Sequence, residues 1–513
     1  MLYDKTPHPY AHFTHLPWAH EPWKAIYTFS RLFTTLLLVP CWTLYYGLLP
    51  RRFRPRPSWS LKQVIYVKFT RRIYKVTEVA GVTFGTRDPD SEPERPLKET
   101  RFEWAEPLPA ELQRGAIKDI MYQVPCKRVG MFVWPKSEPK FEGSAPIIGL
   151  FMHGGGYCHM SATEGARTSN IPRRLMKDGQ FVEIYSVEYR LLQHAPWPAV
   201  LIDAATAYTH VSNMYPLAKI VLIGDSSGGN LVLALTRWIR DQNKLAMPTG
   251  LLLLSPSCDA SHAFPDVPSS YVARPNADTD YLTDTPEPRA LLQRTFLGFK
   301  HRPNTIGSNV IHPEGHDQMD RYLNIFLKMR GRGGMLRTDT GSSIFTGSSA
   351  SFGTSDETKQ DVPAEIQEES RRLKDIVHSE YVSPASPKVL TRWGHEVDLY
   401  DGSKDGPALT AMIKKLGLAP GTPISELPPS MRPSTNIGLF ANFPPAMVVV
   451  GDAERLTTEV GNLMRAMVRD GVTVRERWVK DAVHDILMIP PGWWDEKVRA
   501  EVWGDIARWV DEL

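Results

Sequence analysis

Residues 219–229 read KIVLIGDSSGG. The run begins as an apolar strand over 219–223, turns sharply, and opens a helix near Gly228. This is the G-x-S-x-G pattern in the strand-turn-helix context that exposes a reactive serine above the end of a sheet. We therefore predict that Ser226 is a nucleophile, held at a helix N-terminus where developing negative charge is favoured. A register centred on Ser227 would require glycine at position 225 and is not met.

A second glycine-rich turn precedes the first one in the chain. Residues 153–157 read HGGGY and directly follow the apolar run 147–152. Consecutive glycines let backbone N–H groups converge on one point, as an oxyanion hole requires. We predict that the N–H groups of Gly155, Gly156 and Ser227 are its donors. Either turn alone would also fit an ordinary connection or a phosphate-binding loop.

Together these motifs resemble the hormone-sensitive lipase family of α/β-hydrolases. The resemblance is carried, in order, by HGGGY, Tyr189-Arg190-Leu191, Pro196-Trp197-Pro198-Ala199 with Asp203, and GDSSGG. It covers about 129–254 and 443–513. The membrane-anchored arylacetamide deacetylase and steryl acetyl hydrolase branches look most similar, because this chain has an apolar N-terminal segment.

The fold that this resemblance implies places the acid and then the histidine after the serine. His484 lies past the apolar run 474–479 and resembles the histidine of the family's H-G-F motif, with Asp485 in place of glycine. The family usually shows D-P-L-x-D for the acid. Aligning the leucine of that motif with Leu456 puts Glu454 on the catalytic aspartate, while Asp452 is the competing choice.

The order of predicted elements indicates an α/β fold with a mainly parallel central sheet flanked by helices. Short apolar runs predict strands at 129–134, 147–152, 181–187, 219–223, 250–254, 446–450 and 474–479. Periodic segments predict helices at 199–214, 228–241, 457–469 and 495–513. Residues 59–119 are interpreted as helices and loops.

We divide the chain into an N-terminal region, 1–58, and a catalytic domain, 59–513. An insertion over 260–440 interrupts the catalytic domain and is expected to supply part of a cap or lid. Within it, 331–361 is rich in Gly, Ser and Thr and is predicted to be a flexible loop.

The uncharged segment 32–49 is a membrane-anchor candidate, followed by Arg51, Arg52, Arg54 and Arg56. Its alternative is a buried core helix or a lid, since eighteen residues with an internal proline are marginal for a span. The basic residues after the segment favour a cytosolic catalytic part. We expect membrane lipid as a partner, at the endoplasmic reticulum or another internal membrane.

Charge and cysteine content narrow the classes of function. Lys and Arg number 60 against 57 Asp and Glu, so net charge gives no reason to expect nucleic acid as a partner. The four cysteines have no metal-binding or disulfide spacing. We predict a carboxylic ester hydrolase that needs no metal or cofactor and acts on small apolar acyl esters, such as acetylated lipids or sterols or medium-chain esters. An amidase or deacetylase with the same machinery, and a non-catalytic ligand-binding protein, remain the alternatives.

Overall fold

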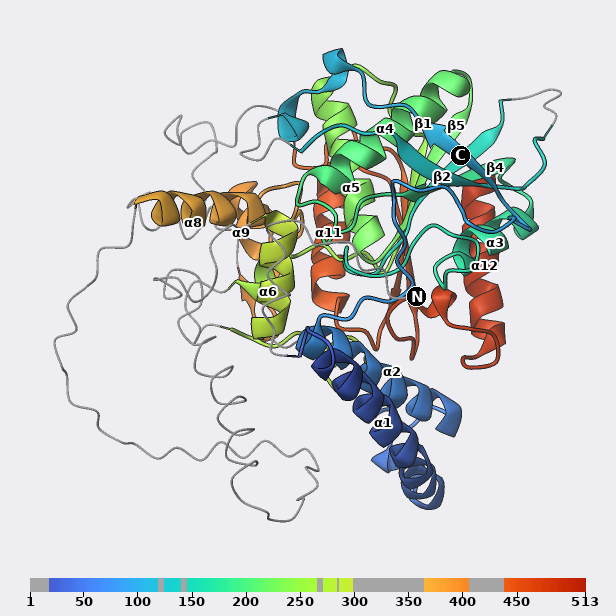
Figure 1. Ribbon diagram of the computed structural model, residues 1–513, viewed down its shortest axis with the longest axis vertical. Helices are drawn as coiled ribbons and strands as arrows, with labels where there is room; N and C mark the ends of the chain where they lie inside the picture. The colour runs from blue at the N-terminus through green and yellow to red at the C-terminus, as the bar shows by residue number, and fades with distance from the viewer. Residues whose placement is uncertain are drawn as a thin grey trace.

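The computed structural model describes residues 18–118, 124–139, 145–264, 271–283, 286–298, 364–405 and 438–513 (Figure 1). Its centre is an eight-stranded sheet in the order β1-β2-β4-β3-β5-β6-β9-β10. The strands are β1 (Arg101–Ala105), β2 (Val129–Trp134), β3 (Ile147–Met152), β4 (Glu183–Glu188), β5 (Lys219–Asp225), β6 (Gly250–Leu254), β9 (Ala446–Gly451) and β10 (Val474–Val479).

All neighbouring strands from β4 to β10 pair in parallel, and β2 runs against both β1 and β4. In the β3–β5 pair Met152 lies opposite Gly224, and in the β5–β6 pair Asp225 lies opposite Leu254. The parallel strands therefore end at one edge of the sheet. In open α/β sheets ligands bind in the crevice outside that edge.

Helices cover both faces of the sheet, as Figure 1 shows. Side chains alternate along β5: Leu222 belongs to one buried cluster, while Val221 and Ile223 belong to the other. The first cluster contains residues of α4 (Ala199–Met214), α5 (Ser227–Gln242) and α11 (Thr457–Arg469). The second contains residues of α3 (Asn170–Asp178) and α12 (Glu496–Asp511). The predicted α/β architecture is confirmed.

One strand of the central sheet was not predicted. β1 lies in the stretch interpreted as helices and loops, and its five residues are RFEWA. Four of these residues are only partly buried, because β1 is an edge strand that contacts the sheet on one side. Such a short, half-polar run carries little of the apolar signal that identified the central strands.

Two N-terminal helices project together from one end of the body (Figure 1). α1 spans Trp23–Leu48 and α2 spans Leu61–Ala80, and the two pack against each other. α2 begins with a capping box between Ser60 and Gln63, and it ends at Gly81, whose φ of 60° is the left-handed conformation that favours glycine.

The predicted anchor segment is part of a longer helix, since α1 begins at Trp23 rather than Leu32. Within the described ranges α1 is the one helix long and apolar enough to cross a membrane, and little of it is buried. Two of the arginines that follow it are used inside the molecule. Arg54 donates to the carbonyls of Trp59 and Tyr46, and Arg56 reaches the loops after β9 and β10.

The described parts of the insertion add elements beside the sheet. These are α6 (Pro286–Leu297), α8 (Ala364–Val377), α9 (Pro387–Arg392) and a small antiparallel pair, β7 (Val397–Asp398) with β8 (Lys404–Asp405). α6 contacts α2, so the second of the two N-terminal helices meets the insertion. The predicted flexible loop 331–361 lies outside the described residues.

Candidate active site

The predicted site residues and Ser255, which was not predicted, follow five parallel strands at the same edge of the sheet. The HGGGY turn follows β3, Ser226 follows β5, and Ser255 follows β6. Glu454 lies just after β9, and His484 lies in the loop after β10. Because parallel strands present their carboxyl ends together, residues from 153 to 484 meet in one place.

The turn at Ser226 is tight. Ser226 has φ of 51° and ψ of −118°, which is unusual for a residue with a side chain and holds Oγ above the sheet. A methyl group at Gly224 would collide with the carbonyl of Gly228, and one at Gly228 would collide with the carbonyl oxygen of Met152. The two glycines of the pattern are therefore required by close backbone packing.

Ser226, His484 and Glu454 form a chain of contacts. Ser226 Oγ lies 2.9 Å from His484 Nε2, and His484 Nδ1 lies 3.7 Å from Glu454 Oε2. The first distance is a hydrogen bond, whereas the second is within ion-pair range and longer than a hydrogen bond. Catalytic hydrogen bonds are often long when no substrate is bound.

Ser255 completes the surroundings of the acid. Ser255 Oγ donates to Glu454 Oε2 at 2.7 Å. Ser255 Oγ also accepts from the backbone N–H of Asp485 at 3.3 Å. Glu454 is fully buried. Burial raises the pKa of its carboxyl to about 7, against the lowering effect of His484 and Ser255.

Asp452, the competing acid, is bound elsewhere. Its Oδ1 accepts from Arg56 Nη1 at 2.8 Å and from the backbone N–H of Asp481 at 2.7 Å. No hydrogen bond or ion pair joins it to His484 within the described ranges. The geometry therefore favours Glu454 as the acid that faces Nδ1 of His484.

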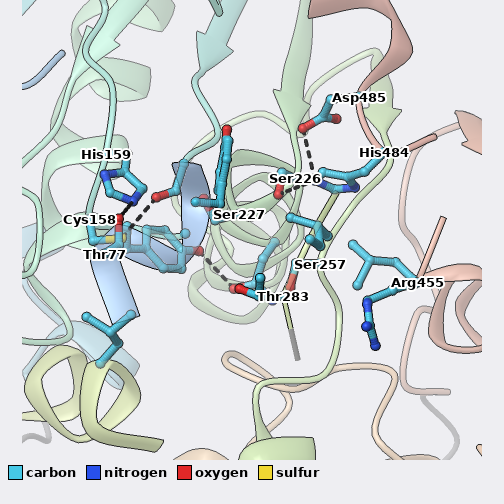
Figure 2. Close-up of a pocket in the computed structure, with 18 of the residues that line it drawn as sticks. Thr77, Cys158, His159, Ser226, Ser227, Ser257, Thr283, Arg455, His484 and Asp485 are labelled. Atoms are coloured by element: carbon cyan, nitrogen blue, oxygen red, sulfur yellow. Dashed lines mark hydrogen bonds and ion pairs between the residues drawn. The ribbon is translucent and has the colours of Figure 1, made fainter. Parts of the chain in front are cut away.

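Asp485 is the unexpected member of the site. Its Oδ2 lies 3.0 Å from His484 Nε2, the same nitrogen that faces Ser226. Figure 2 shows Asp485, His484 and Ser226 together on one side of the pocket. Burial lowers the pKa of His484, but the Asp485 and Glu454 carboxylates outweigh burial and raise it well above its usual range.

The predicted oxyanion loop has the backbone conformation that only glycine adopts readily. Gly155 has φ of 118° and Gly156 has φ of 61°, and both line the same cavity as Ser226 and Ser227. The N–H of Gly154 donates to Asp225 Oδ1 at 2.9 Å, which ties the loop to the turn of the nucleophile.

The remaining motif residues support this loop. The Tyr189 ring stacks on the His153 ring at 4.4 Å between centroids, and its hydroxyl donates to the His153 carbonyl. Arg190 pairs with buried Asp203, with 2.7 Å between Nη2 and Oδ1. Burial lowers the pKa of His153 to about 4, so this ring is neutral at physiological pH.

A cavity of about 210 Å³ opens onto Ser226 (Figure 2). α2 contributes Tyr74, Thr77 and Glu78 to its walls, and α6 contributes Leu292 and Phe296. Helix α2 and the insertion thus form walls of the cavity, as a cap does. In the described part of the chain, no group of three or more His, Cys, Asp or Glu side chains is arranged to hold a metal ion.

Comparison with known proteins agrees with this architecture. A family model described as alpha/beta hydrolase fold matches residues 149–312, which include the oxyanion loop and the nucleophile turn. The chain has the α/β-hydrolase fold. The resemblance to the hormone-sensitive lipase family, predicted from the motifs, is confirmed.

Relatives of this α/β-hydrolase match it over part of their length. A versiconal hemiacetal acetate esterase of Aspergillus parasiticus is 28% identical over 24% of this chain and 38% of its own. Steryl acetyl hydrolase 1 of Saccharomyces cerevisiae is 25% identical over 24% and 29%. An esterase of Acinetobacter venetianus is 32% identical over 24% and 39%. The chain therefore spans about a third of the length of these relatives.

Solved structures give a similar picture. Brefeldin A esterase, a bacterial homologue of human hormone sensitive lipase, is 15% identical and has a TM-score of 0.45, with 83% of this α/β-hydrolase and 80% of that chain covered. A hormone-sensitive lipase from a metagenome library is 18% identical and has a TM-score of 0.39, with 74% and 80% covered.

Sequence reasoning missed several residues around the site of this α/β-hydrolase. Ser255 gave one signal, since a serine directly after a buried parallel strand lies at the ligand-binding edge. Arg56 and the α2 side chains gave none, because their contribution depends on how the N-terminal region packs against the far end of the chain. Asp485 was noticed as a substitution, but its contact with Nε2 was not predicted.

Proposed function

We propose that the chain is a serine carboxylic ester hydrolase. The observation that carries the proposal is the 2.9 Å contact between Ser226 Oγ and His484 Nε2, with Glu454 on the opposite side of the ring. Ser226 attacks the ester carbonyl while His484 accepts its proton, and Glu454 holds the imidazole in the productive tautomer. An acyl-enzyme forms, and water then releases the acid.

The glycine loop supplies electrostatic stabilisation in this proposal. The N–H groups of Gly155, Gly156 and Ser227 donate to the oxyanion of the tetrahedral intermediate, and no metal or cofactor takes part. Removing one such donor typically costs about 10²- to 10³-fold in kcat. The left-handed backbone of Gly155 and Gly156 supports this assignment, because it turns successive N–H groups toward one side.

Apolar acyl esters are the proposed substrates. The cavity beside Ser226 is lined by Leu292, Phe296, Leu456 and Met488 together with aromatic side chains, and such walls favour alkyl over charged groups. The names of two relatives, an acetate esterase and a steryl acetyl hydrolase, support acetylated lipids or sterols within this class.

We also propose that α1 attaches the chain to a membrane. Five large apolar side chains follow one side of the helix and are each more than half exposed: Phe29, Phe33, Leu37, Leu44 and Leu48. Exposed apolar surface of this extent on a helix of 26 residues is typical of a lipid contact. Arg51 and Arg52 follow the helix and remain exposed, where anionic lipid headgroups would attract them.

The experiment that tests the catalytic proposal uses the full chain and a fluorophosphonate probe. Wild type is expected to hydrolyse short acyl esters and to be labelled at Ser226. Ser226→Ala should lose both labelling and about 10⁴-fold or more of the turnover. Ser212→Ala, on α4 and away from the site, is the matched control. Labelling at another serine, or turnover by Ser226→Ala, contradicts the proposal.

A further inference from the structure

Asp485 places a second carboxylate at the reacting end of the imidazole. In the contact chain described above, Glu454 lies on the Nδ1 side of His484, whereas Asp485 Oδ2 lies 3.0 Å from Nε2. The acid of a serine hydrolase needs only the Nδ1 side. Asp485 therefore does something that the proposed mechanism does not require.

The other oxygen of this carboxylate lacks a partner. Asp485 is 5% exposed, and its Oδ1 has no hydrogen bond to any residue that the structure describes. Asp225 is close enough to interact electrostatically with Asp485, but no hydrogen bond joins the two carboxyls in the described ranges. A buried acceptor that stays unpaired is costly, and more so when the group is charged.

The backbone adds to this cost. Asp485 has φ of 48°, in the left-handed region that favours glycine. An aspartate at this position therefore carries both backbone strain and an unpaired oxygen. Strain of this kind clusters at ligand-binding and catalytic positions.

We propose that Asp485 selects esters whose alcohol part carries a hydrogen-bond donor, such as a hydroxyl group, two carbon atoms away from the ester oxygen. This inference rests on the proposed ester hydrolysis and adds a preference for the leaving group. The donor binds the Asp485 carboxylate, which lines the cavity beside His484.

The position of Asp485 identifies the alcohol side of the substrate. During acylation the Ser226 Oγ–carbon bond forms and the carbon–oxygen bond of the alcohol breaks, while the proton of Oγ passes through His484 Nε2 to the departing alcohol oxygen. Nε2 must therefore lie beside that oxygen. The Asp485 carboxylate, 3.0 Å from Nε2, therefore lies near the part of the substrate that is attached to the alcohol oxygen.

The rest of the cavity makes this contact selective. Leu456 and Met488 line it with apolar surface, alongside the polar Ser257 and Arg455. A hydroxyl that reaches the Asp485 carboxylate gains a hydrogen bond to a charged group, whereas a methyl in its place makes no such bond. Sites built to bind a hydroxyl reject the analogue that lacks it far more strongly than apolar pockets reject an added methyl.

The test compares 2-hydroxyethyl butyrate with propyl butyrate, which differ by a hydroxyl in place of a methyl. Wild type is expected to prefer the hydroxyethyl ester by about 10- to 100-fold in kcat/KM, the range for a hydrogen bond to a charged group. Asp485→Gly, which relieves the positive φ, should lose the preference, measured as the ratio of the two kcat/KM values at one pH. Asp485→Asn should lose most of it.

Asp481→Gly is the matched control, because Asp481 also has a positive φ, of 59°, in the same loop but does not line the cavity. It should keep the wild-type preference. Equal rates on the two esters by wild type, or an unchanged preference in both Asp485 variants, overturn the inference. If folded wild type hydrolyses neither ester and Ser226 is not labelled, the proposed function itself fails.

Discussion

Asp452 and Arg56 form an ion pair, with 2.8 Å between Oδ1 and Nη1, although they lie 396 positions apart in the chain. Arg56 also reaches Asp481 at 3.2 Å, and the indole N–H of Trp59 donates to the Asp481 carbonyl at 2.8 Å. The segment between α1 and α2 is therefore tied to the two loops that carry Glu454 and His484. Asp452 serves this connection.

This arrangement predicts different outcomes for two nearly isosteric substitutions. Glu454→Gln should lower kcat by about 10²- to 10⁴-fold, because the amide cannot hold the imidazole or stabilise its charge. Asp452→Asn should keep most of the turnover and lower the melting temperature slightly, because it weakens a partly exposed ion pair. Ester kinetics and thermal unfolding of both variants check this. The opposite ranking of kcat would reassign the acid to Asp452.

Ser255→Ala is expected to lower kcat/KM by about tenfold or more. Its hydroxyl donates to Glu454 Oε2, and a hydrogen bond to a buried carboxylate is worth roughly 1.5–3 kcal/mol. Without it, Glu454 is less firmly held and takes up a proton at higher pH. Steady-state kinetics from pH 6 to 9 measure both effects, and a variant that behaves like Ser212→Ala would show that Ser255 is dispensable.

The pH profile should report the charges around His484. The proposed reaction needs neutral imidazole, and the Asp485 and Glu454 carboxylates stabilise the imidazolium, so they raise the pKa of His484. Asp225 and Asp280 are further acids close enough to interact with this ring. Activity should therefore rise with pH through neutrality and beyond. Asp485→Gly removes one negative charge and should move this rising limb to lower pH, whereas an unmoved limb would mean that the charge of Asp485 does not act on His484.

Gly228→Ala should be strongly destabilising. The added methyl would overlap the Met152 carbonyl oxygen, and overpacking of this kind typically costs about 1–3 kcal/mol or more. We expect a lower melting temperature and little ester hydrolysis. Gly165→Ala is the control, because nothing lies within 4 Å of the added methyl. Thermal unfolding of the two variants should differ clearly.

Membrane attachment is expected to depend on the exposed side of α1. Replacing Phe29, Phe33 and Leu37 together with serine should reduce flotation of the full chain with anionic liposomes, because these side chains are 58–71% exposed. Leu217→Ser, at a residue that is 84% exposed outside α1, is the control. The triple variant should keep its activity on soluble esters. Equal flotation of all three proteins would refute the role of α1.

The sequence predicted the parts of this protein that depend on local pattern. The turns around Ser226 and Gly155 carry their glycines for steric reasons that the motif already encodes, and β6 ends where its apolar run ends. β1 was missed because an edge strand needs little apolar content. The role of α2 as a cavity wall and the Arg56 connection arise from packing between segments hundreds of residues apart, which no local pattern records.

The link between Arg56 and the two C-terminal loops also sets an order of events during synthesis. A growing chain makes α1 and α2 before Ser226, and Ser226 before Asp452, Asp481 and His484. The nucleophile turn can form with β5 and α5 while its base is still absent. A nascent chain would thus carry Ser226 before its proposed base, and the proposed hydrolysis would become possible only once the segment with His484 has joined the rest.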